Sequence, residues 1–357
     1  MERLWWLKVQ IQKLSPSYFA LVMATGIVSM ASHLQQRNAI SNILFWITNI
    51  AFLVLLVLFV LRLVFFFSNV VADLSSHTAG AGFLTMVAGA CILGTSFAQT
   101  KNAFGIATLL WYFGMITWTL FVFSFLCSVI LAREKPSPEK GLNGIWFLLV
   151  VSTQSLSILI GTIAPHLLLP ANVTVFFSLF NFLLGTMLYL MLAPVVIYRL
   201  LFYPMKPDEV SPSYWINMGA AAITTLAGLM LLQNVKSNAL FTELYPFIYG
   251  SSLLFWCVAS FWIPLVLIME IWRYLIKRSP LRYTPGFWSM VFPLGTYSVC
   301  TSRLAEVTHL ELLTTLSKVF LYAAWVAWLA TFTGFILQLI KAGKNSNQKE
   351  GWSFNAP

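Results

Sequence analysis

Small hydroxyl residues recur at helical spacing in five apolar segments of this chain, and they are its first candidates for function. Hydroxyls and glycines can line a narrow polar path through a membrane, or they can let two helix backbones pack closely. Both interpretations stay open, and we favour lining because five alternate segments share the property. The candidate lining residues are Thr25, Ser29, Gly89, Ser152, Ser155, Thr224, Ser289 and Thr296.

The last of these stripes also carries an aromatic ring, a proline and an arginine. Phe292 shares a helical face with Thr296, and an apolar ring there would block ions by dewetting the path. Pro293 lacks an N–H and favours a kink beside the ring. Arg303 ends the stripe, where it would either attract anions or pair with Glu306. We predict a pore gate at Phe292, a helix kink at Pro293 and an anion entrance at Arg303.

The other reactive groups form no pattern typical of an enzyme or a metal site. The four histidines lie at segment ends or in loops, and the four cysteines form no CxxC pair. No charged residue occupies the central part of an apolar segment, where ion-coupled pumps usually carry one. No Ser/His, paired-carboxylate or HExxH constellation lies at membrane depth. We therefore expect a protein that is not an enzyme and has no cofactor and no metal.

The composition is that of a membrane protein. The chain has 357 residues, of which 59% are hydrophobic and 9% are charged, whereas a soluble domain carries roughly 25% charged residues. A bilayer crossing takes about 20 apolar residues. Ten segments qualify, at 16–32, 41–67, 79–98, 104–131, 143–163, 171–200, 213–234, 244–272, 285–303 and 314–340.

These segments alternate in composition along the chain. The odd ones are rich in Gly, Ala, Ser and Thr, and the even ones in Leu, Phe, Trp, Val and Ile. Bulky side chains suit a lipid-facing surface, and small ones suit close helix contact. We predict an all-α integral membrane protein of ten transmembrane helices, arranged as five hairpins in a quasi-five-fold ring around a central pore. The expected parts are an amphipathic cytoplasmic segment at 1–15, a ten-helix channel or transporter domain at 16–340 and a polar cytoplasmic tail at 341–357.

The basic residues predict the orientation. Lys and Arg favour the cytoplasmic side of short loops, and placing the N-terminus inside puts 16 of the 21 basic residues there. The first apolar run resembles a signal peptide, but nine more segments follow it, so we interpret it as a retained crossing. Before it, Leu4, Leu7 and Ile11 share one face beside Trp5 and Trp6, which is typical of a helix lying on a leaflet. We expect a multi-pass protein of the cell (plasma or inner) membrane with both termini cytoplasmic.

Three short motifs resemble those of one transporter family. Residues 288–295, Trp-Ser-Met-Val-Phe-Pro-Leu-Gly, resemble the W-[ST]-x-x-F-P-x-[GT] signature of the ninth helix in the tellurite-resistance/dicarboxylate transporter family. Residues 23–26 resemble its M-[GA]-T-G segment, and residues 215–219 resemble the W-x-N-x-G start of its seventh helix. That family includes bacterial TehA-type proteins, the plant slow anion channel, and fungal malate and sulfite transporters.

The resemblance implies a homotrimer of ten-helix subunits in which Phe292 blocks each pore. Relatives often have a V-x-P-type sequence in the fifth span, where this chain has Ser152, Gln154 and Ser155; these side chains would bind anions or bond to neighbouring helices. The leading hypothesis is passive transport of small inorganic anions or of C4-dicarboxylates such as malate. The alternatives are a proton-coupled dicarboxylate, malate or sulfite carrier, and a membrane enzyme or resistance factor without transport. The expected partners are small anions and the lipid bilayer, and nucleic acid is not expected.

Overall fold

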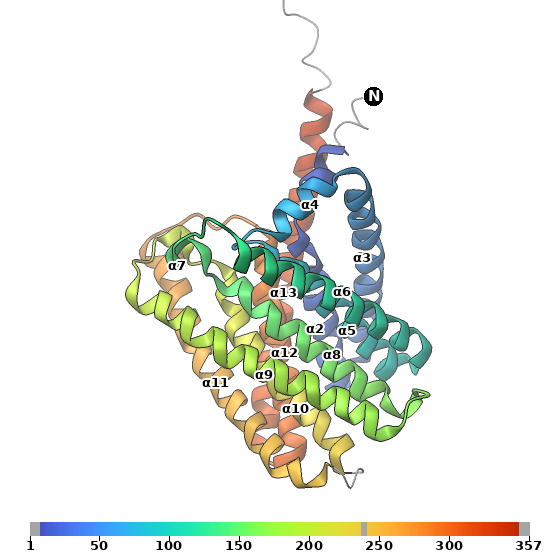
Figure 1. Cartoon of the computed structure of the whole chain (residues 1–357). Coiled ribbons are helices and arrows are strands. Elements are labelled where there is room, and N and C mark those ends of the chain that lie inside the picture. Colours follow the sequence, from blue (N-terminus) through green and yellow to red (C-terminus); the bar gives the residue numbers. More distant parts are fainter. Residues whose placement is uncertain (1–7, 237–240, 350–357) are drawn as a thin grey trace, which may run out of the picture.

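The apolar segments fold into long helices joined by short links (Figure 1). The computed structural model describes residues 8–236 and 241–349, and this part of the chain contains no strand. The long helices are α2 (Ala20–Leu34), α3 (Asn38–Phe65), α5 (Leu84–Lys101), α6 (Phe104–Leu131), α8 (Leu148–Ile163), α9 (Ala171–Phe202), α10 (Trp215–Lys236), α11 (Tyr245–Ile271), α12 (Trp288–Thr308) and α13 (Glu311–Lys349).

Within the described residues, nine helices are long and apolar enough to cross a membrane. The expected ninth crossing, at 285–303, corresponds to α12, which is not one of these nine. Its apolar content is diluted by hydroxyl residues and by Arg303 and Glu306 near its end. An integral membrane protein is therefore supported by nine helices, and α12 has to be assigned by its packing.

Burial follows the alternation predicted from the sequence. In α2, α5, α8 and α10, between 78% and 100% of the most apolar stretch is buried inside the protein, against 28% in α3, α6, α9, α11 and α13. The exposed large apolar side chains lie mainly on this second group. The helices rich in small residues are thus the inner ones, because side chains of low volume allow contact on every side.

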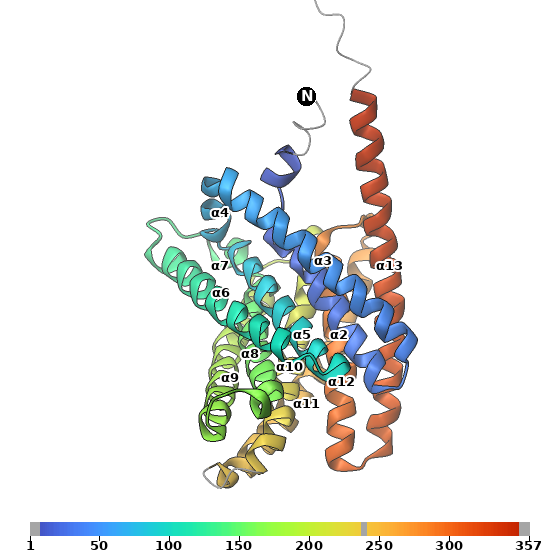
Figure 2. The same cartoon turned by 90° about the vertical axis from the view of Figure 1, so that its right-hand side faces the viewer.

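The inner helices contact one another in a fixed order. α2 contacts α5, α5 contacts α8, α8 contacts α10, α10 contacts α12, and α12 contacts α2. Each inner helix also packs against the long helix that follows it in the chain, so that α2 pairs with α3 and α12 with α13. Figure 2 shows α3 and α13 on the outside of this arrangement.

Every inner helix is preceded by a 3₁₀ turn, and these turns repeat a short pattern. Proline or glycine opens each turn, and Phe or Trp is the last residue of the turn or the first of the helix. Proline suits a first turn because its φ is fixed and it has no N–H to leave unpaired. The turns also contact one another in a closed series. They are η1 (Pro16–Phe19), η2 (Gly80–Phe83), η3 (Gly144–Phe147), η6 (Pro212–Tyr214) and η9 (Pro285–Phe287).

Three arginines lie near the ends of outer helices, in the last turns of α3 and α9 and in the π-helical turn that continues α11, and each bonds the loop before the inner helix of the same hairpin. Arg62 and Arg199 are each 3% exposed, and each also pairs with a carboxylate, Asp73 at 2.6 Å and Glu209 at 3.3 Å. Backbone carbonyls accept a second bond from these guanidinium groups, which fixes the loops at this end of the protein. The arginine–carbonyl pairs are Arg62 with Gln12, Arg199 with Glu139, and Arg273 with Val210.

The two ends of the described chain lie at the same end of the molecule (Figures 1 and 2). Residues 8–12 are helical, and the expected amphipathic residues Leu4, Trp5, Trp6 and Leu7 lie outside the described residues. The short helix α4 (Phe67–Leu74) follows α3 at this end. α13 continues without a break to Lys349, so helix extends into the segment expected to be a polar tail at 341–357.

Candidate functional site: a vestibule, a cavity and an aromatic ring

A vestibule of about 380 Å³ opens where the C-terminal ends of the inner helices meet. Each of the five inner helices contributes to its wall, together with the short turn η4 (Ala164–His166) after α8. The wall contains one guanidinium group, one imidazole, three side-chain amides and one hydroxyl. Its residues are His33, Leu34, Gln99, Gly161, Thr162, Pro165, Met230, Gln233, Asn234 and Arg303.

Arg303 lines this vestibule, at the place where an anion entrance is expected. Its Nη1 donates to Oε2 of Glu306 at 2.9 Å, and the two side chains are 20% and 51% exposed. Arg303 therefore lines the vestibule and also pairs with a carboxylate on its own helix, and its role as an anion entrance stays a prediction.

A much smaller cavity lies among the middle turns of the inner helices. Its volume is about 10 Å³, about the size needed for one water molecule. Ser155, a predicted lining residue, contributes to its wall, and most of the remaining wall is aliphatic. The residues are Ile27, Met30, Ile92, Thr95, Ser155, Ile158, Ile223 and Leu226, from α2, α5, α8 and α10.

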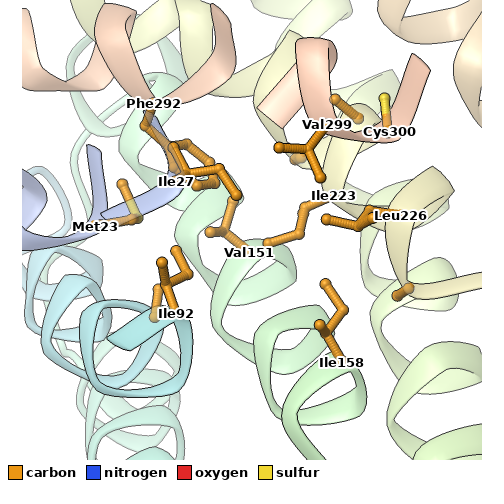
Figure 3. Close-up of a cluster of buried hydrophobic side chains, with 14 of the residues drawn as sticks. Met23, Ile27, Ile92, Val151, Ile158, Ile223, Leu226, Phe292, Val299 and Cys300 are labelled. Carbon is orange, nitrogen blue, oxygen red and sulfur yellow. The ribbon is translucent and has the colours of Figure 1, made fainter. Parts of the chain in front are cut away.

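Phe292 is fully buried and belongs to the same apolar interior. Figure 3 shows it pointing from α12 into a cluster that includes Ile27 of α2 and Val151 of α8. Its ring lies against Gly219 of α10, where a β-carbon would be 3.2 Å from Cε1 and 3.3 Å from Cδ1 of the ring. The absence of a side chain at Gly219 thus provides the space that the ring occupies.

Pro293 lies inside α12, as expected, directly after the aromatic residue. Because proline has no N–H, the carbonyl one turn earlier, at Ser289, has no intrahelical donor from this position. The Cγ atom of Pro293 would lie 2.8 Å from a β-carbon on Gly219. Phe292 and Pro293 therefore both pack on the same glycine, which couples their position to α10.

Three of the predicted lining residues lie at contacts between helices. Thr25 Oγ1 accepts a hydrogen bond from Trp328 Nε1 of α13 at 3.0 Å, and Ser29 Oγ donates to the Ser41 carbonyl of α3 at 2.7 Å. A β-carbon on Gly89 would lie 3.3 Å from Val22 Cγ1 of α2. These contacts hold inner helices to their neighbours, which is the packing interpretation of the small-residue stripes.

The other hydroxyl candidates are buried, and four of the five bond within their own helices. Ser152, Thr224 and Thr296 donate to backbone carbonyls three or four residues earlier, at 2.7 to 3.2 Å, and Ser155 does the same at 2.8 Å. Ser289 is 8% exposed. A hydroxyl that donates to its own helix presents its lone pairs to a neighbour, so these residues offer acceptors more readily than donors.

Several buried polar side chains have no hydrogen-bond partner within the described part of the chain, and two of them, on inner helices, concern the path. They are the hydroxyl of Ser96 and the whole side-chain amide of Asn217. Ser96 lies in α5 between Thr95, which lines the small cavity, and Gln99, which lines the vestibule. A buried polar group without a partner costs about 1–3 kcal/mol, so a polar guest that reached the Ser96 hydroxyl would stabilise it.

Several of these residues were missed by the sequence analysis. Four polar residues of the vestibule wall lie in the last turns of inner helices, namely His33, Gln99, Gln233 and Asn234. Their shared position at helix ends was the sequence signal that could have identified them as wall residues. Within residues 8–236 and 241–349, no group of three His, Cys, Asp or Glu side chains could hold a metal ion.

Comparison with known proteins extends this description to related chains. A family model named SLAC1 and described as a voltage-dependent anion channel matches residues 13–336. An uncharacterized transporter of Methanocaldococcus jannaschii is 28% identical over 327 residues, covering 90% of this chain and 93% of that protein. A second uncharacterized transporter of that organism is 27% identical over 300 residues, covering 82% and 84%. An uncharacterized membrane protein of Mycobacterium tuberculosis is 34% identical over 168 residues, covering 45% of this chain and 83% of that protein.

Proposed function

Because the chain belongs to the SLAC1 family, described as voltage-dependent anion channels, we propose that it is a passive conduit for small anions. The family and the relatives point to membrane transport rather than to an enzyme. The candidate ions are inorganic anions and small carboxylates such as malate.

The observation that carries this proposal is the series of spaces between the inner helices. The vestibule touches all five of them, the small cavity touches four, and Phe292 lies in the apolar interior with Ile27, which lines the small cavity. An anion would pass from the vestibule beside Arg303, past the unbonded hydroxyl of Ser96 and through the small cavity, to the ring of Phe292. The ring and the aliphatic wall form a closed, dry constriction, which is how hydrophobic gates stop ions.

The remaining candidates divide by their contacts. In our proposal, Thr25, Ser29 and Gly89 hold the inner helices to their neighbours beside the path. Ser152, Thr224, Ser289 and Thr296 remain candidate lining residues, because their side chains are buried on inner helices. Pro293 acts as the kink that lets the turn carrying Phe292 tilt.

We assign α12 as the tenth crossing, because it packs between α2 and α10 and pairs with α13. In this proposal the five hairpins form a quasi-five-fold ring around a central pore, and the contact order of the inner helices supports it. The described ends lie on one side of the molecule, in keeping with cytoplasmic termini in the plasma or inner membrane. A homotrimer is the proposed assembly, and crosslinking in native membranes would test it.

Reconstitution of the purified chain in liposomes tests the function. Anion flux without a proton gradient, increased in Phe292→Ala, is the expected result. Uptake of malate only when a proton gradient is present would favour the coupled carrier. If neither the wild type nor Phe292→Ala carries any anion while both remain folded, the conduit is wrong and a non-transport role follows.

A further inference from the structure

The guanidinium group in the vestibule already holds a carboxylate. Glu306 Oε2 accepts from Nη1 of Arg303 at 2.9 Å, three residues further along the same helix. Nε and Nη2 of Arg303 make no hydrogen bond within the described part of the chain. A guanidinium has five N–H donors, so most donors of this residue, which lines the vestibule, remain available to a ligand.

The chemistry of this group selects a class of anion. The planar fork of arginine matches two oxygens of a carboxylate or another planar oxyanion with two parallel N–H···O bonds, whereas a halide has one atom to offer both donors. Gln99 of α5 and Gln233 of α10 place further N–H donors in the same wall. A vestibule of about 380 Å³ has room for a small carboxylate together with water.

Glu306 opposes such binding in two ways. Its carboxylate occupies one arm of the fork, and its charge cancels much of the positive potential that would draw an anion to the vestibule. Its side chain is 51% exposed, so it can leave the guanidinium without a change in the fold.

We propose that the vestibule is a loading site for planar oxyanions, bound by Arg303, and that Glu306 is a tethered competitor that keeps the site weak. This inference rests on the proposed conduit and names the class of anion that its vestibule prefers. A carboxylate from solution replaces the Glu306 carboxylate on the fork, so loading and the internal ion pair exclude each other.

Four variants separate charge from geometry. Glu306→Gln removes the competitor, Arg303→Lys keeps the charge but removes the fork, and Arg303→Gln removes both. Glu311→Gln is the matched control, because Glu311 is an exposed carboxylate at the start of α13 with no ion pair within the described part of the chain.

Acetate and chloride fluxes into liposomes at low and high ionic strength give the readout. We expect Glu306→Gln to raise acetate flux at low salt by about threefold to tenfold, and less at high salt, since screening weakens exposed charges. Arg303→Lys should retain chloride flux while its acetate-to-chloride ratio falls, and Arg303→Gln should lower both fluxes. Glu311→Gln should change neither by more than about 1.5-fold.

A binding measurement keeps the inference independent of transport. Acetate should raise the melting temperature of the detergent-solubilised wild type more than chloride does at equal ionic strength, and Arg303→Lys should remove this difference. An unchanged acetate-to-chloride ratio in Arg303→Lys, or a gain in Glu306→Gln no larger than in Glu311→Gln, overturns the loading site while leaving the conduit intact. Absence of all flux, in Phe292→Ala as well, instead refutes the conduit.

Discussion

Shortening Phe292 should open the proposed path, because its ring fills a close contact between two inner helices. Each 3₁₀ turn opens on Pro or Gly, and an aromatic residue follows three positions later; four residues after that aromatic, the five inner helices have equivalent positions in the repeat. Gly219 on α10 lies against Phe292 on α12. The phenyl ring therefore also fills the space that a side chain at position 219 would take. The five residues are Met23, Val87, Val151, Gly219 and Phe292.

The magnitude separates a gate from a packing residue. A fully buried Phe→Ala change in a soluble core costs about 3–5 kcal/mol, since the cavity stays empty. At a gate, water enters from the vestibule side and fills the space, so the loss of stability should be smaller, below ~3 kcal/mol. Removing a dry constriction lowers the free-energy barrier to ion passage. A reduction of that barrier by roughly 1.4 kcal/mol or more gives at least a tenfold gain in conductance.

The assay pairs single-channel recording in planar bilayers with thermal unfolding in detergent. Phe255→Ala is the control, because Phe255 of α11 is 2% exposed and packs edge-on against Tyr189 of α9 at 5.2 Å, between outer helices. We expect the control to lose stability without any gain in current. If Phe292→Ala inserts normally and conducts no better than wild type, the gate assignment is wrong.

Three further changes test the packing that surrounds the path. Gly219→Ala should alter conductance in the wild type but not in a Phe292→Ala background, since its new β-carbon would press on the ring at 3.2 Å; equal effects in both backgrounds would show that the glycine acts elsewhere. Ser157→Ala removes the 2.7 Å bond to the Ser178 carbonyl and should cost about 0.5–1.5 kcal/mol in thermal unfolding, with conductance unchanged. Arg199→Ala leaves a carboxylate and a carbonyl without their donor and should lower stability by about 1–3 kcal/mol; an unaltered melting temperature would contradict the loop-holding role.

Hydropathy and residue size were sufficient to predict the helices and the inner and outer groups. Long runs such as the one in α3 must be helical in a bilayer because every backbone group needs a partner. Small residues such as those of α10 exclude lipid by allowing close contact, and α10 is indeed the helix with its apolar stretch wholly buried. α12 is not apolar enough to be recognised as a membrane-spanning helix by hydropathy. It packs against protein on several sides, and a helix buried in protein does not need a mainly apolar sequence. Each 3₁₀ turn appears in the sequence only as a Pro or Gly followed by an aromatic residue. This pattern is too short to be recognised as a repeat until the structure shows that the five turns contact one another.

The sequence by itself determined which side chains are small, which are bulky and where each helix begins, since these properties are local. Only the tertiary structure decided the direction of each small side chain. Thr25 and Ser155 belong to similar stripes, yet one accepts a bond from Trp328 and the other borders a cavity. Rotation of a helix about its axis depends on all its neighbours at once, and no periodicity within one helix contains that information. The vestibule around Arg303 is likewise built from the ends of five helices that are distant in the chain, so its existence depends on how those helices pack together.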